Sequence, residues 1–197
     1  MKNIHISEFS RKIFHILNII IPLIHFHLLK DRMDMLIFLS LMLIFCFFIE
    51  LNRTQNSYLF NFFKKYLFFM MRDSEKEGEL TGATWVFVGS LFTIILVPKP
   101  FCLMALLFLA VGDTFAALIG IYYPFFKFGR KTLSGSIGCF VTCCMVGLSF
   151  SFNIASYIII FGAFITTVTE ILSVRINDNL SIPIFSGLSM YLVDILL

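Results

Sequence analysis

Residues 101–123, FCLMALLFLAVGDTFAALIGIYY, form an apolar stretch that carries a single carboxylate, Asp113. The stretch is long enough to cross a membrane as a helix, which takes about 20 apolar residues. At about 1.5 Å per residue, Asp113 then lies roughly 15 Å from the end of the helix at Tyr122 and Tyr123. A lone carboxylate inside a bilayer costs about 2.5 to 3.5 kcal/mol, so we expect Asp113 to have a partner and a function.

The loop after this stretch contains GRKTLSGS at residues 129–136, and its cations Arg130 and Lys131 are candidate partners for Asp113. Glycines, hydroxyls and a lysine at the start of a helix are typical of a phosphate-binding site. The groups that would contribute are Thr132, Ser134, Gly135 and Ser136. The sequence therefore predicts a carboxylate for a metal ion beside a basic loop for phosphates, both at one membrane face.

Structural interpretations of both features stay open. Asp113 could be a buried, hydrogen-bonded carboxylate that serves helix packing, and the basic loop could set orientation and cap a helix through Ser134 or Ser136. Gly112, Ala116 and Gly120 recur every four residues beside Asp113. Small residues at this spacing allow another helix backbone to approach closely, so we expect a helix contact there.

The composition places the chain among membrane proteins. Hydrophobic residues make up 59% of the chain and charged residues 14%, and the mean hydropathy is +0.93. Soluble chains have about 45–50% apolar and about 25% charged residues. We therefore expect an all-α, polytopic membrane helix bundle that forms a single integral membrane domain over residues 1–197, without a nucleic-acid partner.

Hydropathy predicts about seven transmembrane helices and one amphipathic helix. The apolar runs cover residues 13–29, 33–49, 80–97, 101–123, 137–152, 154–174 and 182–197. Several are near the lower limit of about 17 residues for a span. Residues 58–71 place apolar side chains at helical spacing opposite Lys64 and Lys65, which predicts an amphipathic helix on the membrane surface.

The positive charges predict the orientation of these spans. In the seven-span arrangement, 12 of the 15 Lys and Arg residues lie on the side of the N-terminus. Cytoplasmic loops carry the excess of Lys and Arg, so the N-terminus and the predicted site face the cytosol, and the C-terminus lies on the opposite side. In a bacterial cell this membrane would be the inner membrane.

Three further groups of polar residues have the same predicted sidedness. Glu79 opens the third span in ELTGAT, residues 79–84, where an acidic residue also suits a helix N-terminus. Asp178 and its neighbours in NDNLSIP, residues 177–183, share a membrane face with Asp113 but also form an ordinary helix start. Arg11-Lys12-x-x-His15 would share one helical face, although its cations could simply reach the membrane interface.

These motifs together resemble the CTP-dependent lipid kinases, which comprise dolichol kinase, phytol kinase and the yeast-type diacylglycerol kinase and are related to phosphatidate cytidylyltransferase. The resemblance covers nearly the whole chain in order, and it is carried by Arg11-Lys12-x-x-His15, Glu79-Leu-Thr-Gly82-Ala-Thr84, Gly112-Asp113-x-x-Ala116, Lys131-Thr132-x-x-Gly135-Ser136 and Asp178-Asn179-Leu-Ser-Ile-Pro183. The chain departs from the group in two places. It has Asn177 and Asp178 where two acidic residues are frequent, and Ser134 where some members have Glu.

The resemblance implies transfer of a phosphoryl group from CTP to a lipid alcohol such as a polyprenol, dolichol, phytol or diacylglycerol, with Mg²⁺. Asp113 and Asp178 would hold the metal. Lys131 would be catalytic, and Asp113 and Glu79 are candidates to accept the proton of the lipid hydroxyl. The nucleotide would be bound by Arg130, Thr132, Gly135, Ser136 and Asn179.

Two alternatives remain at this point. A cytidylyltransferase would use the same nucleotide and metal, but its acceptor would attack the α-phosphate of CTP. A small transporter would use Asp113 as an ion or proton site, which explains the depth of this carboxylate but not the loop at residues 131–136. The sequence predicts neither the identity of the lipid nor the oligomeric state.

Overall fold

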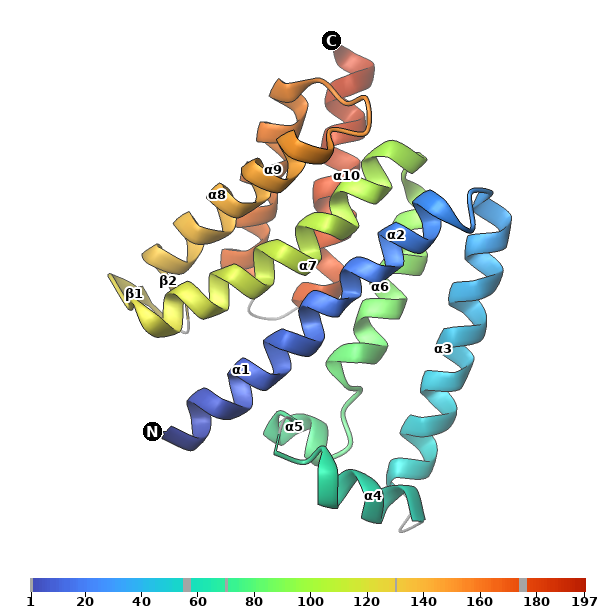
Figure 1. Cartoon of the computed structure of the whole chain (residues 1–197), viewed down its shortest axis with the longest axis vertical. Coiled ribbons are helices and arrows are strands. Elements are labelled where there is room, and N and C mark those ends of the chain that lie inside the picture. Colours follow the sequence, from blue (N-terminus) through green and yellow to red (C-terminus); the bar gives the residue numbers. More distant parts are fainter. Residues whose placement is uncertain (1, 55–57, 70, 130, 174–176) are drawn as a thin grey trace.

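The structure is a computed structural model that describes residues 2–54, 58–69, 71–129, 131–173 and 177–197. These residues form a helical bundle (Figure 1). Its helices are α1 (Lys2–Ile16), the 3₁₀ turn η1 (Leu17–Ile19), α2 (Ile20–His27), α3 (Arg32–Thr54), α4 (Tyr58–Tyr66), α5 (Asp73–Lys76), α6 (Gly82–Leu96), α7 (Lys99–Tyr122), α8 (Leu133–Phe150), α9 (Ser156–Leu172) and α10 (Asp178–Leu196).

Helix α7 is the centre of the bundle. It is buried without interruption from Phe101 to Thr114, and it packs against α1, α8, α9 and α10 (Figure 1). A helix that is apolar on all sides belongs inside a bundle, because no face of it needs water. The apolar run predicted from the sequence at residues 101–123 is therefore the core helix, and it carries Asp113 into the interior.

The helix lengths agree with the predicted all-α membrane bundle. Within the described part of the chain, five segments are long and apolar enough to cross a membrane, namely Glu8–His27, Arg32–Arg53, Lys99–Tyr122, Leu133–Phe150 and Asp178–Leu196. Helices α6 and α9 are apolar but have only 15 and 17 residues. At 1.5 Å per residue they are about 22 and 26 Å long, short of the roughly 30 Å hydrocarbon layer. The count of seven spans stays a prediction.

Two boundaries differ from the sequence prediction in an informative way. Helices α8 and α10 begin at Leu133 and Asp178, about one turn before the apolar runs at 137 and 182. Side chains of Thr132 and Asn177 accept hydrogen bonds from the first turns, so polar residues add a turn that hydropathy alone misses. The polar residues at both starts thus lie on helices.

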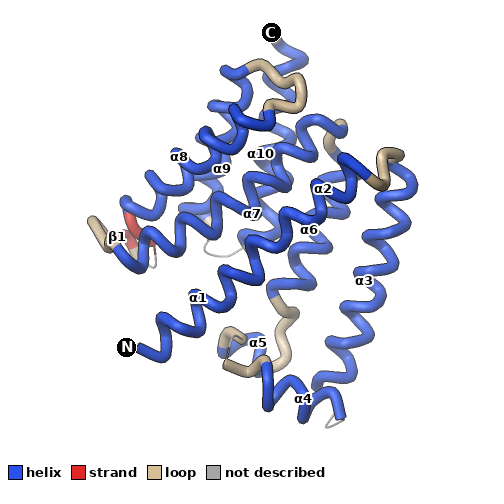
Figure 2. Tube along the Cα trace, in the orientation of Figure 1, coloured by secondary structure: helices blue, strands red, loops and turns tan. Residues whose placement is uncertain are grey.

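A short antiparallel hairpin replaces the plain loop expected between α7 and α8. Strand β1 (Lys127–Phe128) pairs with β2 (Lys131–Thr132), in the register Lys127 opposite Thr132 (Figure 2). Gly129 has φ of +63°, a conformation that glycine adopts without steric cost. Arg130, predicted to bind phosphate, lies outside the described residues.

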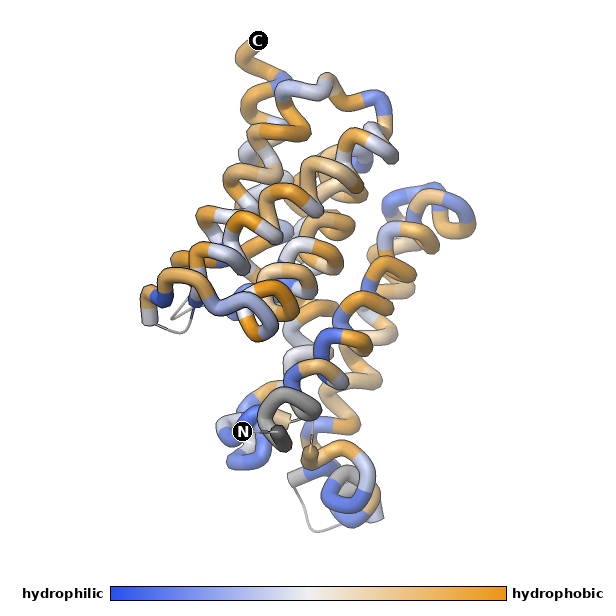
Figure 3. The backbone as a smooth tube through the Cα atoms, turned by 60° about the vertical axis from the view of Figure 1, so that its left-hand side comes forward, coloured by the Kyte–Doolittle hydropathy of each residue, from blue (hydrophilic) through white to orange (hydrophobic). Residues whose placement is uncertain are grey.

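Polar segments lie toward the ends of the bundle. In Figure 1, α5 and the N-terminal half of α1 lie toward the lower end, the hairpin lies at the left near mid-height, and the α2–α3 turn lies on the upper right. Hydropathy along the chain shows the hydrophilic residues at these ends and the hydrophobic ones between them (Figure 3). Helix α4, with Lys64 and Lys65 exposed, confirms a helix over part of the amphipathic segment at 58–71. Its place on a membrane surface stays a prediction.

Candidate functional site

Asp113 has its partners on the first helix, not in the loop after α7. Lys12 Nζ forms an ion pair with Asp113 Oδ2, and His15 Nε2 lies 3.2 Å from the same oxygen. Lys12 and Asp113 are 4% and 5% exposed. Arg130 and Lys131 were the partners expected from the sequence. Arg130 lies outside the described residues, and Lys131 interacts with Asp113 electrostatically but makes its ion pair elsewhere; α1 packs on α7 and supplies the direct contacts from the motif Arg11-Lys12-x-x-His15.

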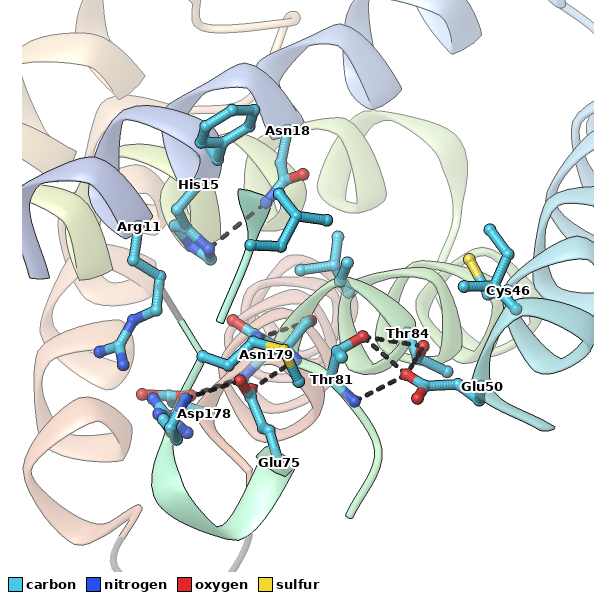
Figure 4. Close-up of a pocket in the computed structure, with 18 of the residues that line it drawn as sticks. Arg11, His15, Asn18, Cys46, Glu50, Glu75, Thr81, Thr84, Asp178 and Asn179 are labelled. Atoms are coloured by element: carbon cyan, nitrogen blue, oxygen red, sulfur yellow. Dashed lines mark hydrogen bonds between the residues drawn. The ribbon is translucent and has the colours of Figure 1, made fainter. Parts of the chain in front are cut away.

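The ring of His15 is fixed by neighbours on both sides. Its Nε2 is also 3.3 Å from the carbonyl oxygen of Leu109, and its Nδ1 is 3.3 Å from Asn18 Nδ2 (Figure 4). A neutral ring fits this arrangement, with Nε2 donating toward Asp113 and Leu109 and Nδ1 accepting from the Asn18 amide. His15 therefore orients the Asp113 carboxylate from the side of α1.

Lys131 forms an ion pair with Glu170, a carboxylate on α9. Lys131 Nζ lies 2.5 Å from Glu170 Oε1, and Glu170 is 3% exposed. Burial opposes the charge of Lys131, but the carboxylates of Glu170 and Asp113 outweigh it and raise the pKa of the ammonium group above its ordinary value. Glu170 Oε2 has no hydrogen-bond partner among the described residues. Lys131 is thus charged at neutral pH and close enough to Asp113 to interact with it.

The start of α8 uses its polar groups within the chain. Thr132 Oγ1 accepts a hydrogen bond of 3.1 Å from the N–H of Gly135, and Ser136 Oγ donates 3.2 Å to the Thr132 carbonyl. A Cβ atom on Gly135 would lie 2.5 Å from the Ala116 carbonyl oxygen of α7. The Gly135 N–H is thus bonded within the chain, and its phosphate-binding role stays a prediction. Thr132 caps the helix, and Gly135 lets α7 and α8 approach each other.

The start of α10 contributes one carboxylate and one structural amide. Asp178 lines a cavity shared with Asp113. Asn179, predicted to bind the nucleotide, is buried, and its Nδ2 donates 3.0 Å to the Gly82 carbonyl at the start of α6 (Figure 4). The side-chain amide of Asn179 therefore joins α10 to α6, while Asp178 remains at the cavity.

Glu79 is exposed and does not line this cavity, so its predicted catalytic role has no support from the cavity and stays a prediction. The carboxylate that contacts the start of α6 is Glu50 of α3. Its Oε1 accepts from the Thr81 N–H, the Thr81 hydroxyl and the Thr84 hydroxyl at 2.7 to 2.8 Å (Figure 4), and its Oε2 accepts from Arg53. With all of these bonds made, Glu50 holds α3 to α6 as a satisfied buried group.

The cavity has a volume of about 390 Å³ and lies between α1, α3, α6 and the starts of α5 and α10. Its cations and carboxylates come from five helices and the segment before α5, and they are Arg11, Lys12, Arg53, Arg72, Glu50, Glu75, Asp113 and Asp178. Its other lining residues are mainly apolar. Asp113 and Asp178, two of the predicted site residues, thus open on a common space with Lys12 and Arg11.

Among curated proteins, the chain matches "Uncharacterized protein RP860" of Rickettsia prowazekii (strain Madrid E), with 32% identity over 190 residues that cover 92% of each chain. The chain belongs to the family of this rickettsial protein. No family model and no solved structure matches the chain. The name of the rickettsial relative states no activity, so this family membership does not indicate a function.

The structure brings together some of the residues predicted for the site and separates others. Asp113, Asp178 and the Lys131 side chain form one group. Thr132, Gly135, Ser136 and Asn179 surround it through capping and packing contacts, and Glu79 lies apart. The sequence did not predict that Lys12 and His15 contact Asp113 or that Glu170 contacts Lys131. For the first two, the shared helical face of Arg11-Lys12-x-x-His15 was the available signal, whereas Glu170 had no signal beyond being a carboxylate in an apolar run.

Proposed function

We propose that this membrane protein transfers the terminal phosphoryl group of CTP to the hydroxyl of a membrane lipid alcohol, assisted by Mg²⁺. The donor nucleotide and the acceptor class come from the resemblance to CTP-dependent lipid kinases. We place the site on the cytosolic side, because most Lys and Arg residues of the chain lie at this end in the seven-span arrangement.

The observation that supports the proposal is the joint position of Asp113, Lys12 and Asp178 on one cavity. Phosphoryl transfer needs positive charge near the phosphates, a metal-binding carboxylate and an aligned acceptor hydroxyl. Lys12 and Arg11 line the cavity, and Lys131 lies beside Asp113 outside it. A small transporter would also need Asp113, but it gives no reason for these cations to gather around it.

The donor set agrees with a magnesium ion that shares its ligands with a nucleotide. Among the described residues there is no group of three or more His, Cys, Asp or Glu side chains that could hold a metal. Mg²⁺ in nucleotide sites is bound by one or two carboxylates, with waters and phosphate oxygens completing the shell. Asp113 and Asp178 would be these carboxylates, and the bound ion would neutralise charge on the phosphates.

The residues of the chain would act as follows. Lys12, which neutralises Asp113 in this structure, would turn toward the phosphates when the nucleotide is bound, because its ammonium group then has a second anionic partner. Lys131 would approach the same phosphates from the side of α9, held by Glu170. His15 would keep the Asp113 carboxylate in place while its ion pair is exchanged.

The position of a label decides the reaction. We expect purified protein with a panel of lipid alcohols to incorporate label from the γ-phosphate of CTP into lipid, and none from the α-phosphate. The reaction should require Mg²⁺, and Lys131→Ala should lower it by about tenfold or more, as loss of a phosphate-binding charge does. Incorporation from the α-phosphate would assign the protein as a cytidylyltransferase. No incorporation from either position with any lipid would favour a transporter.

A further inference from the structure

The cavity at Asp113 has an apolar side as well as a charged side. The charged side contains Arg53, Arg72, Glu75 and Asp178. The apolar side is formed by Phe14 of α1, Cys46 and Ile49 of α3, Val86 and Ala83 of α6, and Leu67 and Met71 after α4. A ligand that fills the whole space must therefore have a polar end and an apolar end.

The few polar side chains on the apolar side are already occupied. The amide of Asn18 is 3.3 Å from His15, and the Thr84 hydroxyl donates 2.8 Å to Glu50. These two groups thus already have hydrogen-bond partners within the chain. The contact available on this side is apolar contact, which suits a hydrocarbon chain.

The part of the apolar side formed by α3 lies at membrane depth. Cys46 is two turns before Arg53, which is the last residue of the candidate span in α3, and this places it about 10 Å from that end of the span. Asp113 is about 14 Å from the end of α7 at Tyr122 by the same rise per residue. The cavity therefore extends from the polar end of the bundle into the layer where lipid chains lie.

The cavity reaches the surface between α1 and α3. Helix α1 packs on α7 and helix α3 packs on α6, so the two helices stand on opposite sides of the cavity (Figure 1). Phe14 lines the cavity and is 57% exposed, and Ala83 lines it and is also exposed. Nearby, Leu17 of η1 and Phe45 of α3 are also exposed. The part of the rim between α1 and α3 is thus apolar.

We infer that this cavity binds the lipid alcohol of the proposed reaction, and that the lipid enters sideways between α1 and α3. The hydroxyl head group of this lipid is inferred from the proposed function. The position of its hydrocarbon chain is inferred from the apolar side of the cavity. The volume is in the range of about 300 to 1,000 Å³ found for small-molecule sites. It holds the hydroxyl end and the first part of one chain along Phe14, Ile49 and Val86, while the rest of the chain stays in the bilayer.

Ala83 is the position that tests this inference, since it is exposed and lines the cavity. We expect Ala83→Phe to raise the KM for the lipid alcohol about tenfold or more, as filling a substrate pocket does, and to leave the KM for CTP and the thermal unfolding temperature unchanged. Ala155→Phe adds the same side chain at an exposed position before α9 and should change none of these values. An unchanged KM for the lipid in a folded Ala83→Phe protein overturns the inference.

A second variant and a direct readout cover the remaining outcomes. Cys46→Phe narrows the cavity from α3 and should give the same rise if Ala83→Phe does not fold. A lipid alcohol with a photoreactive group in its chain should cross-link to Phe14 or Ile49 in the unsubstituted protein, and Ala83→Phe should abolish this product. Cross-linking there without any phosphorylation would keep the binding site and remove the proposed reaction. Phosphorylation of the lipid with cross-links only at other residues would support the proposed reaction and overturn the proposed binding site.

Discussion

Lys12 and Asp113 show how a membrane helix can carry a carboxylate in its buried core. The two residues are 101 positions apart in the chain and form an ion pair away from solvent. A single charge there would be costly, whereas a pair with a further contact from His15 is tolerated. The pair therefore both stabilises the contact of α1 with α7 and holds charged groups ready at the cavity.

Because the pair serves both stability and the site, substitutions should change stability and activity separately. Asp113→Asn leaves the Lys12 charge buried without its partner, so we expect a loss of about 3 to 5 kcal/mol in the free energy of unfolding together with loss of activity. Lys12→Met combined with Asp113→Asn removes both charges at similar volume. This double variant should regain most of the stability and none of the activity.

The measurements are thermal unfolding in detergent and phosphorylation per folded molecule. Asp73→Asn is the matched control, because Asp73 has a highly exposed side chain at 94% and only a surface partner, Lys76. Near-normal turnover in the double variant would show that Asp113 is a structural residue and not part of the site.

At the scale of the elements, glycines set the contact between α7 and α8. Cβ atoms on Gly112, Gly120 and Gly135 would lie 2.8 Å from Cys143 Sγ, 2.7 Å from Thr132 Oγ1 and 2.5 Å from the Ala116 carbonyl oxygen, respectively. These distances are too short for real Cβ contacts, so the two helices approach as closely as their backbones allow. The close approach also places the hairpin, and with it Lys131, next to α7.

Gly135→Ala should therefore destabilise the bundle. The added methyl group meets a backbone carbonyl that cannot turn aside, and overpacking of this kind costs about 1 to 3 kcal/mol in the free energy of unfolding. Gly82→Ala is the control, because its nearest neighbour would be the Asn179 side chain at 3.4 Å. Thermal unfolding of the two variants should differ clearly. Equal unfolding temperatures would mean that α8 can shift away from α7 at little cost.

At the scale of the whole molecule, the charges are unevenly distributed between the two ends of the bundle. The end with the hairpin and α5 carries exposed Lys127, Lys64 and Lys65, whereas at the opposite end the cations Lys30 and Arg32 stand beside the acidic Asp31. By the positive-inside rule, this difference predicts that the basic end faces the cytosol. The proposed site at Asp113 opens toward the basic end, so its nucleotide would come from the cytosol.

Cysteine labelling tests this orientation. In intact cells we expect Ser156→Cys, exposed at the start of α9, to react with an impermeant thiol reagent, and Lys127→Cys in the hairpin to react only after the membrane is opened. The unsubstituted protein is the control for its five native cysteines, which are buried or partly buried. Labelling of Lys127→Cys from outside would reverse the orientation and place the cavity on the wrong side for a cytosolic nucleotide.

The sequence by itself determined the class of the fold and the identity of its central helix. Hydropathy is a local property, so the apolar runs fall on α3, α6, α7, α8, α9 and α10 with boundaries that differ mainly where a polar cap adds a turn. The isolated carboxylate at Asp113 and the small residues beside it could be recognised for the same reason. Each stands out against its own neighbours in the chain.

Only the tertiary structure decided which groups meet. The partners of Asp113 and Lys131 are Lys12 and Glu170, which lie 101 and 39 positions away, and no local pattern states which helices become neighbours. Polar residues at a helix start can bind a ligand or cap the helix. In this structure, the Gly135 N–H is bonded to the cap Thr132, and the Asn179 amide joins α10 to α6. The cavity likewise exists only between helices, because its walls come from segments that are distant in sequence and adjacent in space.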